Sequence, residues 1–131
     1  MTGSDRSAGR EKGRGVVKHA DAVERCEVAA GRATQAQVLL GPQDGMPSFS
    51  MRRFSMGEAG GMPRHTNSVE HEQFVLRGRA EVGIGGDVHE VGPGDALYIP
   101  AGVPHYYSVL EAPFEFLCMV PNSPDRIEIL E

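Results

Sequence analysis

The chain has 131 residues, of which 40% are hydrophobic, and carries a net charge of −5 at neutral pH. This length and hydrophobic content predict one domain with one core. No apolar run approaches the roughly 20 residues of a membrane helix, and the N-terminus lacks the apolar stretch of a secretory signal, so we expect a cytoplasmic protein that does not contact a membrane.

The N-terminal segment is basic and rich in glycine, whereas the rest of the chain is acidic. Residues 1–18 contain five basic and two acidic residues and no aromatic residue. We therefore predict a disordered basic tail over residues 1–20 and a single domain over residues 21–131. The acidic body argues against nucleic acid as a partner. Two cysteines, Cys26 and Cys118, are too few for a disulfide framework, and we expect both to be reduced and partly buried.

Short apolar segments follow one another at a spacing of about ten residues, separated by glycine and proline. This pattern is typical of an all-β sandwich or barrel. Residues 21–30 are predicted to be a short helix or an irregular lead-in. The expected strands cover residues 37–40, 49–56, 72–76, 79–84, 88–91, 96–99, 105–110 and 114–120. A last alternating segment, residues 127–130, is predicted to be an edge strand or a contact with a partner subunit, and with the need to cover edge strands it favours a homodimer.

Three of the five histidines, His65, His71 and His105, lie where strands can direct them to one point. Because side chains alternate along a strand, His65 shares a face with Asn67, and His71 shares a face with Gln73. Three neutral imidazoles suit Zn, Fe, Ni or Cu, and three protein ligands with open positions are the catalytic pattern. A lone histidine is more often a surface residue, and we expect this of His19 and His89.

The glycines and prolines around these histidines resemble the two motifs of the cupin superfamily. The second motif is matched by Gly94-x5-Pro100-x-Gly102-x2-His105. Residues 60–78 are similar to the first motif, with His65 as its first histidine and Gly78 as its closing glycine. The resemblance implies a double-stranded β-helix, the jelly-roll barrel of this superfamily.

Two departures from the first motif bear on function. Asn67 stands where the second histidine is usual, and His71 stands where the acid is usual. The neighbouring Glu72 faces away from His71 by strand alternation. The resemblance therefore implies one divalent metal ion on His65, His71 and His105, with Asn67 as a weak fourth ligand through its amide oxygen. Zinc is the first expectation, with iron, nickel or manganese as alternatives, and a cupin that has lost its metal stays open.

Residues 65–73 and 121–128 further resemble the small cupin polyketide cyclases of aromatic type II polyketide pathways, of the tetracenomycin, resistomycin and spore-pigment type. This implies a metal-dependent aldol cyclisation of a poly-β-ketone in an apolar pocket. We expect catalytic roles for His71 and for Gln73, which can bind a substrate carbonyl or orient a ligand. Candidate lining residues, half or more of them expected to be plain core, are Phe49, Met51, Phe54, Met56, Phe74, Tyr98, Tyr107, Phe114, Phe116 and Met119.

Two other functions stay open on this sequence. A three-histidine Fe(II) site is also a cupin solution for dioxygen chemistry, so the chain can be a dioxygenase acting on an aromatic or quinone-type metabolite. The third alternative is a non-catalytic cupin that binds a small molecule.

Overall fold

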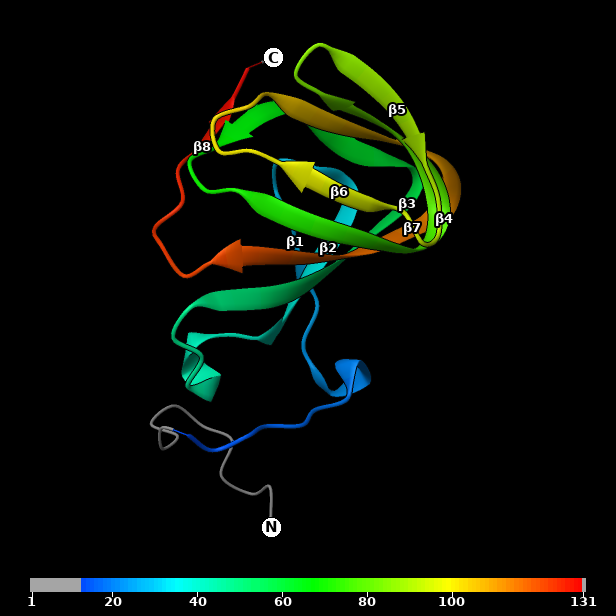
Figure 1. Cartoon of the computed structure of the whole chain (residues 1–131). Helices are drawn as coiled ribbons and strands as arrows, with labels where there is room; N and C mark the ends of the chain where they lie inside the picture. The colour runs from blue at the N-terminus through cyan, green and yellow to red at the C-terminus, as the bar shows by residue number, and fades with distance from the viewer. Residues whose placement is uncertain (1–12, 131) are drawn as a thin grey trace.

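The computed structural model describes residues 13–130 and consists almost entirely of antiparallel strands (Figure 1). Two short 3-10 turns, Ala20–Ala22 and Pro42–Asp44, precede or connect strands. The strands are β1 (Cys26–Glu27), β2 (Arg32–Leu40), β3 (Phe49–Asn67), β4 (His71–Ile84), β5 (Asp87–Val91), β6 (Ala96–Ile99), β7 (His105–Pro121) and β8 (Ile127–Ile129).

One sheet, in the order β1-β2-β3-β7-β4-β5, wraps into two facing layers. The wrapping comes from three long strands, β3, β4 and β7, whose pairing registers shift near their middles. Such shifts bend a strand, so each of the three passes from one layer to the other. In the first layer Phe54 pairs with Phe116, and in the second His65 pairs with His105. Figure 1 shows β4 and β7 curving together where the layers meet. The all-β jelly-roll prediction is confirmed.

The positions of three expected breaks were wrong. Residues 60–63, residue 78 and residues 111–113 fall in the gaps between the expected strands, but they are bends inside continuous strands. Glycine marks such a bend as readily as it marks a chain reversal, because both need unusual backbone angles. Gly78 has a φ of 78°, and a Cβ there would lie 2.1 Å from the Pro113 carbonyl oxygen. Its role is therefore to let β4 and β7 approach at the bend.

The core lies between the layers and is built from the inward faces of β3, β4 and β7. Strand alternation in β3 places Arg52, Phe54 and Met56 toward the inside, while Phe49 is exposed. The hydrophobic residues Phe49 and Met51 suggested that these two positions face inward and Arg52 outward. The structure shows the opposite for Arg52, which lines the cavity. The fully buried core side chains include Met56, Val75, Ala80, Val82, Ile99, Phe114, Phe116 and Cys118.

Two backbone connections bring distant segments of the sequence together at the end of the barrel. The Gly102 amide in the turn before β7 donates to the Asn67 carbonyl over 2.8 Å, which ties the second motif to the first. The C-terminal β8 pairs with β3, with Ile129 opposite His65. Of the two alternatives for this segment, the structure shows an edge strand of the same chain, and the homodimer stays a prediction.

The predicted tail over residues 1–20 lies mostly outside the described residues. In its described part, the Lys18 ammonium forms an ion pair with the buried Asp44 carboxylate at 3.0 Å. Cys26 is exposed rather than partly buried, Cys118 is buried, and neither is in a disulfide. No described helix is long and apolar enough to span a membrane.

The contrast between two phenylalanines tests this packing. Phe114 is 1% exposed, whereas Phe74 is 43% exposed on the outer face of β4. Phe114→Ala is expected to lower the free energy of unfolding by about 3–5 kcal/mol, because it leaves a cavity in the core. Phe74→Ala is expected to cost less than about 1 kcal/mol. Urea denaturation of both variants measures the difference, and similar losses would contradict the assigned strand phases.

Candidate functional site

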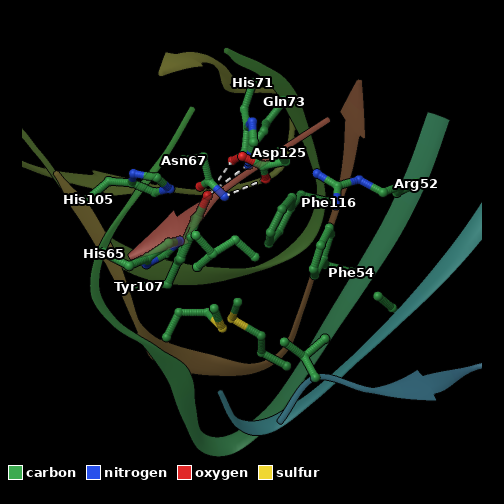
Figure 2. A pocket seen from close by; sticks show the side chains of 15 residues that line it. Arg52, Phe54, His65, Asn67, His71, Gln73, His105, Tyr107, Phe116 and Asp125 are labelled. Atoms are coloured by element: carbon green, nitrogen blue, oxygen red, sulfur yellow. Dashed lines mark hydrogen bonds between the residues drawn. The ribbon is translucent and has the colours of Figure 1, made fainter. Parts of the chain in front are cut away.

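A cavity of about 170 Å³ opens between the two layers. All five residues predicted as metal ligands or catalytic groups line it. Figure 2 shows the histidines, Asn67 and Asp125 gathered toward one end, and Arg52 apart from them beside the Phe54 and Phe116 rings. Its lining residues are Val28, Ala36, Arg52, Phe54, Met56, Met62, His65, Asn67, His71, Gln73, His105, Tyr107, Phe116, Asp125 and Ile127. His19 and His89 are exposed and lie outside it, as predicted.

His65 and His105 are a directly opposed pair on β3 and β7, with their ring centroids 4.2 Å apart. The Nδ1 atom of His65 lies 2.7 Å from the Pro63 carbonyl oxygen, and that of His105 lies 3.0 Å from the Val103 carbonyl oxygen. A carbonyl oxygen only accepts, so Nδ1 carries the proton in both rings and Nε2 keeps a free lone pair. This arrangement is the usual one for histidines that bind metal through Nε2.

His71 comes from the start of β4 in the facing layer. Its ring centroid lies 5.9 Å from that of His105, and the rings meet edge to face. Its Nδ1 atom is buried and makes no hydrogen bond of acceptable distance and angle, although the Glu70 backbone lies near enough to raise the pKa of the ring. His71 is thus the only one of the three imidazoles whose orientation is not fixed by a described hydrogen bond from its side chain.

Burial keeps two of these histidines neutral. It lowers the pKa of His105 to about 4, against a smaller upward effect of the Val103 carbonyl. Burial also lowers the pKa of His71, against the upward effect of the Glu70 backbone. At neutral pH both imidazoles are therefore uncharged, which is the form that binds a metal ion or accepts a proton.

Asn67 is oriented by a residue that sequence analysis gave no role, Asp125. The Asn67 Nδ2 atom donates to an Asp125 carboxylate oxygen over 2.8 Å, and the other carboxylate oxygen accepts from the Ser68 backbone over 2.9 Å. A carboxylate only accepts, so the amide group of Asn67 must turn its nitrogen to Asp125. Its Oδ1 atom is left buried and without a partner.

The donor atoms present fit a divalent metal ion in chemistry. Two free Nε2 atoms, an unpartnered imidazole and an unpartnered amide oxygen border one cavity. Over the described part of the chain, four buried side-chain polar atoms lack a partner, and three of them belong to lining residues of this cavity. Buried polar groups are normally satisfied, so this concentration indicates a ligand. Among residues 13–130, however, no three His, Cys, Asp or Glu side chains lie close enough together to hold a metal ion.

Gln73, the other predicted catalytic residue, lies beside His71 inside the cavity, as strand alternation required. Its amide is already engaged. Nε2 donates to the Tyr107 hydroxyl over 2.8 Å and to the Cys118 sulfur over 3.4 Å, and Oε1 accepts from Tyr107 over 3.0 Å. These bonds suit Gln73 to orienting its neighbours.

Parallel aromatic rings form the wall of the cavity. Phe116 stacks on Phe54 with centroids 5.2 Å apart and on Tyr107 with centroids 5.3 Å apart, both within 14° of parallel. Four of the ten predicted lining residues, Phe54, Met56, Tyr107 and Phe116, line the cavity. Phe114 is plain core, whereas Phe49, Phe74 and Tyr98 are exposed, because their strands have the opposite phase at those positions.

Sequence analysis missed two charged residues of the lining, Arg52 and Asp125. His71 replaces the usual acid of the first motif, but the cavity still contains an acid, because Asp125 enters it from the segment before β8. Glu72 lies outside the cavity, as alternation predicted. Burial and the adjacent Glu70 carboxylate raise its pKa to about 7.

The comparisons with known proteins agree with this architecture. Residues 52–120 match the family model described as a cupin domain. The polyketide cyclase RemF from Streptomyces resistomycificus superposes with a TM-score of 0.80 at 29% identity, over 90% of this chain and 88% of that one. Rru_A2000 from Rhodospirillum rubrum, a cupin-2 domain, gives 0.75 at 23% identity, over 93% and 84%.

KdgF from Halomonas sp. shares the fold at 17% identity, with a TM-score of 0.69 over 79% of this chain and 92% of that one. No curated protein sequence matches this chain at a significant level. The family match covers more than half of the chain and includes the β3, β4 and β7 segments that enclose the cavity. On these grounds the chain belongs to the cupin family.

Proposed function

We propose that this cupin is a metal-dependent cyclase that closes a ring in a poly-β-ketone chain by aldol condensation. The observation that carries the proposal is the pair of free Nε2 atoms on His65 and His105, placed beside unpartnered His71 and Asn67 atoms at the end of an aromatic cavity. The overall likeness to the polyketide cyclase RemF supports the same reaction class.

Each residue has a definite task in this proposal. His65, His105 and Asn67, with His71, hold the ion, which when bound polarises a carbonyl oxygen. Asp125 fixes the amide of Asn67, and the Pro63 and Val103 carbonyls fix the two imidazoles. These hydrogen bonds orient His65, His105 and Asn67, but the side chains have to draw closer together before three of them can hold one ion.

His71 can take one of two roles, and a single ring nitrogen cannot perform both at once. Its neutral imidazole can bind the ion, or it can accept the proton that leaves the carbon between two carbonyls. The lowered pKa and the unpartnered Nδ1 atom suit either role. Metal binding and turnover, measured separately on the same variant, distinguish them.

The aromatic wall supplies the third requirement of the reaction, a fixed register of a flexible chain. An engineered apolar cavity of about 150 Å³ holds one benzene molecule, so a cavity of about 170 Å³ has room for one ring. Phe54, Phe116 and Tyr107 present flat faces against which a nascent ring can lie. We therefore propose that one ring closes inside while the rest of the chain lies outside the mouth.

Metal titration tests the histidines without any substrate. His65→Ala and His105→Ala are each expected to weaken zinc binding by more than about 100-fold, because a two-imidazole site is far poorer than a three-imidazole site. Calorimetric titration of the chelator-treated protein measures the loss. His89→Ala is the matched control, since His89 is an exposed histidine outside the cavity. Unchanged binding in both cavity variants would remove the proposed metal site.

Asn67 is expected to contribute less than the histidines. Asn67→Ala should weaken zinc binding by about 10–100-fold, the range of residues that support metal ligands. Asn67→His should tighten it, because an imidazole replaces a neutral amide oxygen at the same inward position. The same titration measures both, and weaker binding by Asn67→His would exclude Asn67 from the metal site.

Product analysis under nitrogen tests the reaction class. A poly-β-ketone chain supplied by a minimal ketosynthase and acyl carrier protein should give the cyclised product with the wild-type protein and uncontrolled shunt products with His105→Ala. Aldol chemistry needs no oxidant, so removing dioxygen should change nothing. Mass spectrometry of the products gives the readout, with His89→Ala again as the control.

The outcomes of this experiment separate the alternatives. A product that forms only in the presence of dioxygen, together with iron in elemental analysis, would show the dioxygenase instead. A product profile that is the same for wild type and His105→Ala would leave a non-catalytic binding protein. Loss of cyclisation in His71→Ala with retained zinc binding would assign His71 as the base.

A further inference from the structure

Arg52 is a charged residue inside the cavity that the proposed metal chemistry does not use. It lies on the inner face of β3 two residues before Phe54, directly opposite Cys118 on β7. Figure 2 shows its guanidinium pointing inward from the strand, toward the space bordered by Phe116 and Asp125. The register of β3 and β7 therefore fixes a permanent positive charge in a mostly apolar cavity.

The partners of this guanidinium are few and weak. One Nη atom donates to the Cys118 sulfur over 3.3 Å, and the guanidinium lies 5.0 Å from the centre of the Phe54 ring. The Nε atom is buried without a partner. None of the described carboxylates forms an ion pair with Arg52, whereas the surface Arg79 is paired with Glu90 at 2.9 Å.

The side chains around Arg52 do not compensate its charge. Burial raises the pKa of the Cys118 thiol, so this group is uncharged at neutral pH. The Gln73 amide is neutral and already bonded to Tyr107 and Cys118. Arg52 is partly exposed, but its buried Nε atom has no partner, which is costly, and neither a thiol sulfur nor a ring face requires an arginine.

The next residue along the strand, Arg53, has a hydrogen-bond partner. Arg53 faces the other side of β3, where its Nε atom donates to the Gln37 side chain over 2.9 Å. Arg53 does not line the cavity. Two adjacent arginines thus differ in one respect that bears on ligands, since only Arg52 lines the cavity and has a side-chain nitrogen without a hydrogen-bond partner.

We propose that Arg52 binds an anionic oxygen carried by the planar part of the ligand, an enolate or a carboxylate. Guanidinium groups bind such oxygens with short, charge-assisted hydrogen bonds. With the Gln73 amide engaged, Arg52 is the described donor in this part of the lining that still has an unpartnered atom. The cavity then recognises a ring with polar oxygens at two positions, one facing the histidines and the other facing Arg52.

This inference rests on the proposed function only for the polyketide nature of the ligand. The site for the anion is tested without turnover, using three single-ring probes. 4-Fluorobenzoate carries a carboxylate, 1,3-cyclohexanedione ionises to an enolate at neutral pH, and 4-fluorobenzamide is neutral. Binding to the full-length protein is followed by ligand NMR, both as purified and after chelator treatment, so that coordination to a metal is separated from binding to Arg52.

At least one anion is expected to bind about tenfold more tightly than the amide, the size of one charge-assisted contact. The preference should survive chelation and be lost in Arg52→Gln and Arg52→Met. Arg53→Gln is the matched control and should keep it. Which anion is preferred identifies the oxygen, the enolate indicating the reacting diketone and the carboxylate a terminal acid.

Thermal unfolding separates this role from a structural one. Removing an unpaired, partly buried charge should leave the melting temperature of Arg52→Met unchanged or raised. The proposal is overturned if neither anion binds preferentially, or if the preference persists in both Arg52 variants. An Arg52-dependent preference for an anion without any cyclisation would refute the proposed function and keep the anion site. Cyclisation without an Arg52-dependent preference would keep the proposed function and refute the anion site.

Discussion

The pairing of His65 with His105 across β3 and β7 is the constraint on which the cavity depends. The same antiparallel register places Phe54 against Phe116 and Arg52 against Cys118 in the other layer. Because side chains alternate with period two, a slip of one residue would turn all of these groups to the outside together. The metal donors, the aromatic wall and the cation therefore depend together on one pairing register of β3 and β7.

Local hydrogen bonds then determine which atoms of these groups are available. The carbonyls of Pro63 and Val103, each two residues before a histidine, hold the Nδ1 protons of His65 and His105. Asp125 holds the nitrogen of Asn67. In each case a carbonyl or carboxylate oxygen, which can only accept, binds the N–H of the imidazole or amide. The acceptor atom of that imidazole or amide is left without a protein partner. The cavity end is thus rich in neutral lone pairs, which a cation or a proton can occupy.

The sequence predicted this end of the cavity better than the other. Strand alternation from His65 to Asn67 and from His71 to Gln73 gave the correct face, since each pair lies at a strand end and no register shift falls within it. Alternation failed in the first part of β3 because Phe49 and Met51 are out of phase with Phe54 and Met56, so the hydrophobic pattern supports both phases. Pairing with β7, which decides between them, is a long-range contact that no local pattern contains. Asp125 escaped for a related reason, because its approach to Asn67 depends on β8 joining β3.

The two charged residues of the cavity lining, Asp125 and Arg52, have different electrostatic effects. Asp125 raises the pKa of both His71 and His105 to a small extent, against the larger effect of burial. Its carboxylate is held by Asn67 and Ser68, which spread its charge over fixed donors. Arg52 has no such partners, and in a cavity of low dielectric constant its charge favours negative charge on whatever enters. An apolar side chain at position 52 would not cost stability, which agrees with the proposal that this arginine serves to bind an anionic oxygen in the cavity.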